Sequence, residues 1–551
     1  MSHPKSNPMD RDPAADQARL SAILAEARAA HHEQAIAQAR AALAEGLEHP
    51  LLLNLAALGL EREGRTAEAE PLLRRAVQIA PRDLGCRNAL GLCLLALERA
   101  PEALEQFDAA IGLDPALGHL HANRGNALRA LGALAAAQTS YERAVELDAA
   151  QAMALAGLAS IACRRGAYGE ARSWADRALA LAPGLAEGLM SLAAAEFGER
   201  QLGRAEARLQ ELLDGRGLSD VERAYGQGLL GDVLDAEGRY EEAFAAYTRC
   251  NEALRQRYAG RFASALEYAE ALTGWLDRAA AGEPARLAPG AQAAPSAPAK
   301  DHVFIIGFPR SGTRLLSVIL EGHPQVATLV ERECLLEAVL EFMRRPEDLG
   351  RLWAASPQTL EHFRAAYWRR VGAAGLDPSG KVFVDCCALN TLKLPLIVRL
   401  FPTAKILFAC RDPRDIVLSS FRNRLAMSAP AYELLTIEGA ARYYAALMQL
   451  LVGCTSLLGL EACLVRHEDV VTGFTREMRR VCEFLGLEWH PAMRDFALRA
   501  RERDEPAPNL AQWIHNLGTE GIGLWRHYRS VLEPVRALLE PWVQRFYYDP
   551  D

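Results

Sequence analysis

Small apolar residues recur along the first half of the chain at a fixed interval of 34 residues. One alanine series runs from Ala35 to Ala205, and a second runs from Ala42 to Ala178 at the same interval. An interval of this length, sustained over six units, predicts an array of repeats in which each unit is a pair of helices stacked on its neighbours. The first half of the chain is therefore expected to form an α-solenoid.

One unit, APEALEQFDAAIGLDP from Ala100 to Pro115, shows how the helices are expected to pack. Ala103 and Ala110 lie on one helical face, where small side chains let a neighbouring helix approach, and Phe107 lies between them and fills the groove. Pro115 follows the expected helix end and starts the next unit. The period and the residue types resemble the tetratricopeptide repeat. Such repeats imply a concave groove for peptides or partner proteins, and a spacer or self-association surface is the open alternative.

Changes in composition divide the chain into four predicted segments. The solenoid is assigned to residues 18–276, after a disordered N-terminus at residues 1–17. Ala, Pro and Gly without periodicity at residues 277–300 indicate a flexible linker between domains. The remaining residues, 301–551, contain short apolar runs typical of buried strands and are expected to form a second domain.

Two segments of the second half predict a strand that leads through an anion-binding turn into a helix. The first, VFIIGFPRSGTRLL at residues 303–316, spaces two glycines as nucleotide phosphate-binding loops do, but Thr313 and Arg314 replace the usual lysine and hydroxyl residue. The second places Arg411 and Ser419 after the apolar run AKILFAC. The carboxyl ends of strands are where open α/β sheets bind ligands, so both turns are candidate binding segments.

These two motifs, in this order, resemble those of the sulfotransferase superfamily. PRSGT at residues 309–313 is similar to its 5′-phosphosulfate loop, and Arg411 with Ser419 has the spacing of its 3′-phosphate motif. The similarity continues through LVRHEDVV, CEFLGLEWHPAM and GIGLWRHYR. It extends to bacterial enzymes that carry tetratricopeptide repeats before the sulfotransferase domain and, more distantly, to tyrosylprotein sulfotransferases. The resemblance implies a three-layer α/β, P-loop-like fold and transfer of a sulfuryl group to an acceptor hydroxyl.

The resemblance also implies a donor and the residues that hold it. The donor, 3′-phosphoadenosine 5′-phosphosulfate (PAPS), is a co-substrate that presents less charge than the phosphates of ATP, so no metal is required. Arg310 is expected to polarise the transferring group, and Arg411 with Ser419 to select the 3′-phosphate. The residues expected to bind the donor are Arg310, Ser311, Gly312, Thr313, Arg314, Arg411 and Ser419.

A general base is implied seven residues beyond the His-Pro pair that follows the loop. His323 and Pro324 place Glu331 at this position, with Glu333 as the runner-up. A carboxylate near its ordinary pKa can serve, because the hydroxyl becomes more acidic as it attacks. The structural alternative is a solvated loop carboxylate without a catalytic role.

Three residues depart from the family pattern. Cys386 stands where a lysine is usual, Arg314 replaces the second threonine of the loop, and Leu524 stands where a basic residue often precedes the tryptophan. A neutral thiol cannot stabilise charge on the leaving phosphate. Either Arg314 restores the lost positive charge and the enzyme works with a rearranged site, or the domain is a weak or inactive sulfotransferase-fold scaffold that binds partners through its repeats.

Composition bears on the partners and the cellular compartment that are expected for the chain. The formal net charge is −8, which disfavours nucleic-acid binding by the chain as a whole. The sequence has no apolar run of bilayer length and no apolar core of a secretory signal, so no membrane span is expected. Eleven cysteines without paired spacing argue against a zinc site and favour a reducing cytoplasm. The repeats favour a protein or peptide as the acceptor, whose identity stays open.

Overall fold

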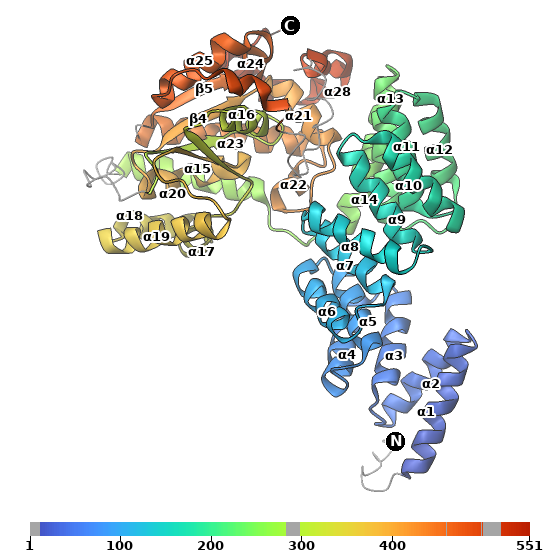
Figure 1. Cartoon of the computed structure of the whole chain (residues 1–551). Coiled ribbons are helices and arrows are strands. Elements are labelled where there is room, and N and C mark those ends of the chain that lie inside the picture. Colours follow the sequence, from blue (N-terminus) through green and yellow to red (C-terminus); the bar gives the residue numbers. More distant parts are fainter. Residues whose placement is uncertain (1–11, 283–297, 459, 498, 500–518, 551) are drawn as a thin grey trace. The chain divides into compact units, whose positions relative to one another are not determined.

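The N-terminal part of the chain is built from antiparallel helices that follow one another at a regular interval (Figure 1). The computed structural model describes residues 12–282, 298–458, 460–497, 499 and 519–550. Eleven helices precede the point, after Gln201, at which the chain divides into two compact units. Their bounds are α1 Pro13–Arg28, α2 His32–Ala44, α3 Pro50–Arg62, α4 Thr66–Ile79, α5 Leu84–Ala96, α6 Ala100–Leu113, α7 Gly118–Ala130, α8 Leu134–Leu147, α9 Ala152–Arg164, α10 Tyr168–Leu181 and α11 Ala186–Gly198.

The helices recur at the 34-residue interval that the sequence predicts. The second helices of successive units, α2, α4, α6, α8 and α10, begin 34 residues apart. The alanines of both series are fully buried on these helices and on α12: Ala35, Ala42, Ala69, Ala76, Ala103, Ala110, Ala137, Ala144, Ala171, Ala178 and Ala205. The solenoid and the packing role of its small residues are therefore confirmed.

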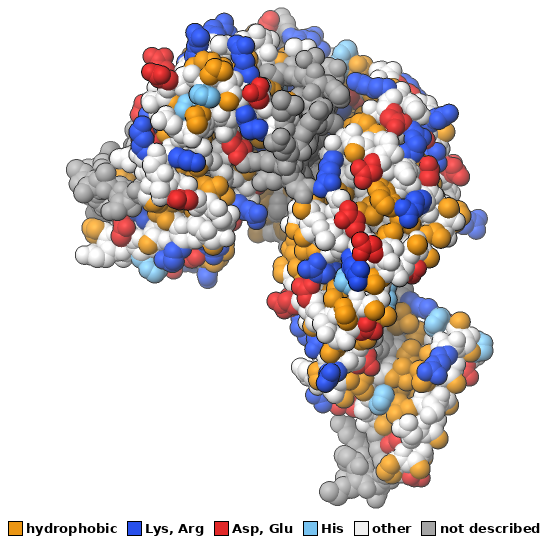
Figure 2. All heavy atoms as spheres, viewed as in Figure 1, with side chains coloured by type: hydrophobic (Ala, Val, Ile, Leu, Met, Phe, Trp, Pro, Cys, Tyr) orange, Lys and Arg blue, Asp and Glu red, His pale blue; other side chains and the backbone are white. Residues whose placement is uncertain are grey.

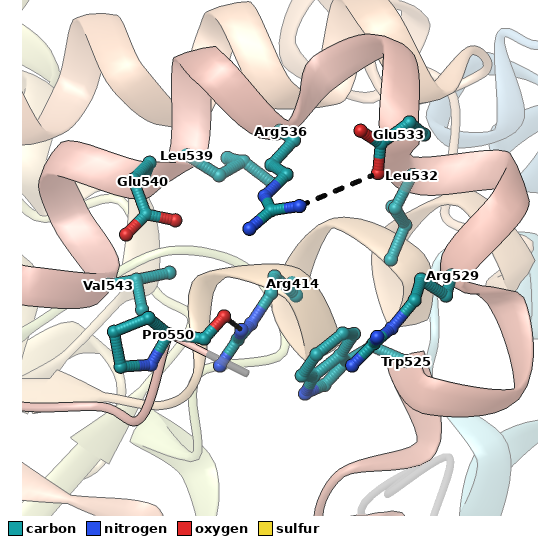
Figure 3. A pocket seen from close by; sticks show the side chains of 10 residues that line it. All are labelled: Arg414, Trp525, Arg529, Leu532, Glu533, Arg536, Leu539, Glu540, Val543 and Pro550. Atoms are coloured by element: carbon teal, nitrogen blue, oxygen red, sulfur yellow. Dashed lines mark hydrogen bonds and ion pairs between the residues drawn. The ribbon is translucent and has the colours of Figure 1, made fainter.

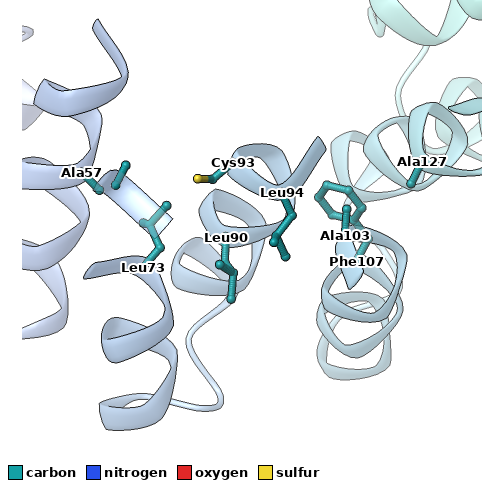
Figure 4. Packing of buried hydrophobic residues seen from close by; sticks show 9 residues of the cluster. Ala57, Leu73, Leu90, Cys93, Leu94, Ala103, Phe107 and Ala127 are labelled. Carbon is teal, nitrogen blue, oxygen red and sulfur yellow. The ribbon is translucent and has the colours of Figure 1, made fainter. Parts of the chain in front are cut away.

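Two of the repeats pack an aromatic ring of the second helix into a space that a glycine leaves on the first helix. Phe107 of α6 lies in a core cluster with Leu90 and Leu94 of α5 (Figure 4). A Cβ atom added at Gly91 would lie 2.5 Å from the Phe107 ring, and one added at Gly125 would lie 2.5 Å from the Tyr141 ring. These contacts are too short for any side chain, so glycine is required where the two helices approach.

The outer face of the repeats carries charges of both signs in close alternation, as Figure 2 shows on the face it presents. Ion pairs join neighbouring repeats: Arg99 lies 2.6 Å from Glu70, and Arg74 lies 2.6 Å from Glu102. Exposed pairs of this kind each contribute little, so the apolar cores carry most of the stability of the solenoid.

Replacing Phe107 by Ala is expected to destabilise the repeats around α5 and α6 by about 3–5 kcal/mol, because it leaves a cavity in a closed core. Hydrogen exchange in the full-length chain should accelerate in these helices. Leu113→Ala is the matched control, since Leu113 is 37% exposed and its truncation empties no cavity. Equal acceleration in both variants would contradict the packing role of Phe107.

The second compact unit begins with four more helices. Their bounds are α12 Leu202–Asp214, α13 Asp220–Ala236, α14 Tyr240–Arg257 and α15 Ala265–Gly282. α13 and α14 form the last helix pair of repeat type, and α14 begins four residues later than the 34-residue interval from Leu202 would place it. α15 buries Ala265, Ala269, Leu272 and Leu276 along one face and packs against α23 (Ile437–Leu458) of the second half.

The structure moves three of the expected boundaries. α1 begins at Pro13, inside the segment 1–17 that was expected to be disordered, because Asp12 caps its first turn. α15 continues to Gly282, past the expected linker start at residue 277, because its apolar face is buried by α23. The division after Gln201 falls inside the expected solenoid, 18–276. The rest of the expected N-terminal segment and most of the linker lie outside the described residues.

A five-stranded parallel sheet forms the centre of the second half, in the order β2-β3-β1-β4-β5. The strands are β1 Asp301–Ile306, β2 Val326–Val330, β3 Val382–Cys386, β4 Lys405–Cys410 and β5 Ala462–Arg466. β1 pairs with β4 in the register Val303 with Lys405, so the two predicted binding turns leave the sheet side by side. β3 is buried along its whole length, as expected for a parallel sheet covered on both faces.

Helices and short 3₁₀ turns connect and cover these strands. α16 packs against β1, β2 and β3, and α25 packs against β5, while α23 contacts α20, α21 and α29. The predicted three-layer α/β domain is confirmed. The remaining elements are α16 Thr313–Glu321, α17 Leu336–Phe342, η3 Pro346–Asp348, α18 Leu349–Ala354, α19 Pro357–Ala373, η4 Ala388–Lys393, α20 Leu394–Leu400, α21 Pro413–Arg422, α22 Ala429–Glu433, α24 His467–Thr472, α25 Phe474–Leu485, η5 Pro491–Asp495, η6 Thr519–Gly521, η7 Leu524–Tyr528, α28 Arg529–Leu532, η8 Glu533–Val535 and α29 Arg536–Arg545.

The length and hydropathy of the helices bear on membranes. Within the ranges that the structure describes, none of the helices combines the length and the apolar composition that crossing a membrane requires.

Candidate functional site

The predicted site residues follow the carboxyl ends of the strands, which lie at one edge of the sheet because all strands run parallel. β1 leads into the glycine loop and β4 into Arg411, while β5 is followed at once by His467. On the other side of β1, β2 ends just before Glu331, and β3 ends at Cys386. One edge of one sheet therefore collects every candidate, as expected for ligand binding by open α/β folds.

The glycine loop is a close-packed turn that ends in the N-terminus of α16. A Cβ atom at Gly307 would lie 2.7 Å from the carbonyl oxygen of Ala409, so β1 and β4 could not come together with a larger residue there. Gly312 has φ 97°, a left-handed conformation that glycine adopts freely, and it caps α16. The Ser311 Oγ accepts a hydrogen bond from the Phe308 N–H at 3.3 Å. The first N–H groups of α16, from Thr313 onward, lack partners within the helix and form an anion-binding terminus.

Arg310 joins the two predicted phosphate motifs directly. Its Nε donates to the Ser419 Oγ at 3.1 Å, so the loop after β1 contacts the helix after β4. Its backbone has φ 74°, a left-handed conformation that costs a non-glycine residue energy. Such strain persists where the surrounding structure fixes a side chain in one direction, which here is toward α21.

Arg411 lies at the other side of this cluster, held by two oxygen atoms. One guanidinium nitrogen donates to the carbonyl of Gly521 and lies 3.9 Å from a carboxylate oxygen of Asp415. Asp415 also accepts the backbone N–H groups of Gly523 at 2.7 Å and Trp525 at 2.9 Å. The segment GIGLW is therefore fastened to α21 through a single buried carboxylate. Asp415 was not predicted as a site residue, and its only sequence signal is its place one turn beyond Arg411 in RDPRD.

The electrostatics of the cluster are dominated by buried positive charge. Burial, together with the charges of Arg411 and Arg422, lowers the pKa of Arg310 to about 10, which leaves it charged at pH 7. Burial and the same kind of repulsion, from Arg411 and Arg310, lower the pKa of His467 to about 3, so this ring stays neutral. Like charges held together in a buried place favour a bound anion.

Glu331 directly follows the end of β2 and is exposed to solvent. Its backbone has φ 50°, and its N–H donates to the carbonyl of Cys386 at 2.8 Å. Desolvation raises the pKa of the Glu331 carboxyl, against a hydrogen bond from Cys387 and the charge of Arg314, which lower it. Glu333, the runner-up, has a side chain that is 45% exposed and forms an ion pair with Lys393. Both glutamates are exposed, and they differ in their surroundings: Glu331 adjoins the end of β3, whereas Glu333 is paired with Lys393.

Cys386 points toward the first turn of α16. Its thiol donates to the carbonyl of Thr313 at 3.4 Å, and burial raises its pKa well above the ordinary value, so the thiol is neutral. Arg314 lies in the same turn, and its charge lowers the pKa of Glu331. Two of the three residues that depart from the family pattern, Cys386 and Arg314, therefore adjoin the first turn of α16, and the described contacts of the Cys386 thiol include no cation.

Arg414 has a structural role next to the site. It forms a two-pronged ion pair with Asp412 and donates to the backbone carbonyls of Asp549 and Pro550. Its guanidinium lies 3.7 Å from the ring centroid of Trp525. Together they line one side of a pocket of about 40 Å³ whose other side is formed by α28 and α29 (Figure 3).

Thr391 is a further residue that the sequence did not signal. Its hydroxyl accepts from the Gly307 N–H at 3.0 Å and donates to the Gly307 carbonyl at 2.6 Å, so η4, the turn that follows β3, fixes the start of the glycine loop. Among the described residues, no group of three or more His, Cys, Asp or Glu side chains is placed to hold a metal ion.

Replacing Asp415 by Ala is expected to release the segment from Gly521 to Trp525, because two buried N–H groups lose their acceptor at about 1–3 kcal/mol each. Hydrogen exchange of residues 519–530 should accelerate. Asp415→Asn keeps one oxygen acceptor and should show a smaller acceleration. An unchanged exchange rate in the Ala variant would show that this carboxylate does not hold the segment.

Comparison with known proteins agrees with this geometry. Residues 302–491 match the sequence profile of the Sulfotransferase family. Residues 123–186 and 224–253 match profiles of the Tetratricopeptide repeat. The second repeat match covers most of α13 and α14.

Three known proteins are similar in sequence to part of this chain. The chain is 24% identical to Protein-tyrosine sulfotransferase A of Caenorhabditis elegans over 269 residues, 45% of this chain and 67% of that protein. It is 35% identical to Protein O-mannosyl-transferase TMTC1 of Mus musculus over 153 residues, 27% of this chain and 16% of that protein. It is 24% identical to an uncharacterised protein of Aquifex aeolicus over 268 residues, 46% of this chain. The matched segments span 34% of the Aquifex protein and 16% of the mouse protein, so this chain covers a minor part of both.

Proposed function

We propose that this chain, in which tetratricopeptide repeats precede a sulfotransferase-family domain, transfers a sulfuryl group from PAPS to a hydroxyl group of a protein or peptide. The observation that carries the proposal is the pair of buried like charges, Arg310 and Arg411, at the carboxyl edge of the sheet and beside the N-terminus of α16. Holding these charges together without an anion is costly, and a donor with phosphate groups at both ends offsets that cost.

The side chains present fit such a donor. Arg411 has a buried Nε for which the described residues supply no acceptor, while its other nitrogen is held by Gly521. A 3′-phosphate is the kind of acceptor that satisfies this group, with the Ser419 hydroxyl beside it. Ser311, Gly312, Thr313 and Arg314 would hold the 5′-phosphate at the helix terminus, with Arg310 between the two ends.

The transfer step follows from these positions. The acceptor oxygen attacks the sulfur in line with the bridging oxygen of the donor; the new S–O bond forms as the S–O bond to the phosphate breaks, and adenosine 3′,5′-bisphosphate leaves. The proton of the acceptor hydroxyl passes to Glu331, and Arg310 offsets the charge on the departing phosphate. The similarity to relatives named protein-tyrosine sulfotransferases supports a protein acceptor, and the repeats supply a surface to hold one.

The second candidate function is a scaffold that binds partners through its repeats and carries a weak or inactive transferase domain. The neutral, buried thiol of Cys386 favours it, because no charge at that place can stabilise the leaving phosphate. When labelled donor is incubated with a panel of peptides, an active transferase predicts that label appears on a peptide, whereas an inactive scaffold predicts that none does.

Replacing Glu331 by Gln is expected to lower the transfer rate by about 10²–10⁴-fold, because the acceptor proton loses its base. In the unsubstituted chain the rate should rise with pH, since the carboxyl must be ionised, and the rise should occur above the ordinary Glu range because desolvation raises this pKa. The Gln variant should lose that dependence.

Glu333→Gln is the matched control, and its transfer rate should stay close to that of the unsubstituted chain, since this side chain is 45% exposed and is not the proposed base. Equal transfer by the Glu331→Gln variant and the unsubstituted chain would remove Glu331 from the mechanism. Donor affinity is measured for each variant. A lower rate with unchanged affinity indicates loss of the base, whereas a lower affinity indicates disruption of the donor site.

The departure at Cys386 and Arg314 predicts a compensating pair. Arg314→Thr should abolish turnover, and Arg314→Thr combined with Cys386→Lys should recover it, because a cation returns to the place that the family uses. Turnover and donor affinity are measured for both variants. A double variant that binds the donor normally and stays inactive would show that Arg314 does not replace the lysine.

A further inference from the structure

Two carboxylates of α13, the first helix of the last repeat pair, contact the end of the helix that carries Ser419. Asp235 lies 2.7 Å from the guanidinium of Arg422, in the last turn of α21. Asp232 forms an ion pair with Arg424, two residues further on. All four side chains are at least three-quarters buried, with exposed fractions between 13% and 24%.

Each carboxylate also accepts a tyrosine hydroxyl, which closes the network. Tyr247 of α14 donates to Asp232 at 3.0 Å, and Tyr528 of η7 donates to Asp235. The Arg422 guanidinium lies 5.3 Å from the ring centroid of Tyr247. Carboxylates with two charged or hydroxyl donors are fixed in place, so α13 determines where the end of α21 and the segment before α28 lie.

Further contacts from α14 hold the backbone of the same turn. The Asn251 Nδ2 donates to the carbonyl of Phe421 at 2.8 Å, and the rings of Phe244 and Phe421 stack with centroids 5.2 Å apart. At Gly228 of α13, an added Cβ atom would lie 2.6 Å from the Arg424 side chain. α13 and α14 are thus shaped to receive two arginines, whereas ordinary helix packing requires only apolar surfaces.

This network reaches the donor motifs through Ser419 and Arg310. Ser419 lies one turn before Arg422 on α21 and accepts the Arg310 Nε. Asp232 raises the pKa of Arg310, while Arg422 lowers it, so the repeat carboxylate acts on the same charge as the site arginines. A buried carboxylate partner keeps Arg422 charged and holds its guanidinium against α13.

We propose that Asp235 and Asp232 of the last repeat are positioning residues of the donor site, which act through Arg422 and Arg424 to hold Ser419 and the end of α21 in place for recognition of a 3′-phosphate. The last helix pair of repeat type is therefore part of the nucleotide site as well as of the repeat array. The proposal rests on the proposed function, because it takes the ligand of Ser419 to be the 3′-phosphate of the donor.

The test compares two nucleotides that differ only in this phosphate. Titration calorimetry of the full-length chain measures the affinity for adenosine 3′,5′-bisphosphate and for AMP. The unsubstituted chain should prefer the bisphosphate. Asp235→Asn should weaken bisphosphate binding about tenfold and leave AMP binding nearly unchanged, and Asp235→Glu, which keeps the charge, should restore most of the preference.

Asp108→Asn is the matched control, since Asp108 forms a comparable 2.6 Å ion pair with Arg124 within the first compact unit. It should leave both affinities unchanged. Asp232→Asn is measured in parallel, and it decides the question if Asp235→Asn does not fold, which circular dichroism reports.

The outcomes separate this inference from the proposed function. Equal weakening of both nucleotides in the Asp variants, or no change in either, would overturn the positioning role while the preference of the unsubstituted chain still supports the donor. No bisphosphate binding by the unsubstituted chain would overturn the donor assignment and this inference with it.

Discussion

The second half of the chain depends on one electrostatic constraint: a cluster of arginines is buried where a parallel sheet ends. Parallel strands deliver all their following turns to one edge, so Arg310 after β1 and Arg411 after β4 come together there. Desolvation and mutual repulsion make such a cluster costly, and the cost is offset only by carboxylates or by an anion.

The carboxylates that balance these arginines come from two parts of the chain. Every arginine between residues 411 and 424 lies against one: Arg411 with Asp415, Arg414 with Asp412, Arg422 with Asp235 and Arg424 with Asp232. Two of these partners belong to the loop or helix of the arginine itself, and two come from the last repeat. The last helix pair of repeat type therefore supplies counter-charge for the domain that contains the sheet.

What could be predicted from the sequence was local. The 34-residue interval gave the helices of the solenoid, because each buried alanine recurs at the same place in a unit, and the glycine loop and Arg411 could be placed because each directly follows an apolar strand. The roles of Asp415 and Thr391 could not, since a carboxylate or hydroxyl that accepts a distant backbone N–H leaves no periodic signal. The pair Asp235 and Arg422 is separated by 187 residues, and only the fold brings them together.

Two of the three departures from the family pattern, Cys386 and Arg314, change the same charge balance in opposite directions. A thiol at Cys386 removes a cation from the end of β3, beside the first turn of α16, while Arg314 adds one in that turn, where its charge lowers the pKa of Glu331. In the proposed reaction, positive charge on the side of the leaving phosphate speeds its departure, and positive charge beside the base keeps the base ionised. Together, the two substitutions therefore lower the stabilisation of the leaving phosphate and raise that of the ionised base. Desolvation raises the pKa of Glu331 and the charge of Arg314 lowers it, so in the proposed reaction this cation favours the ionised base while the leaving side has lost a cation.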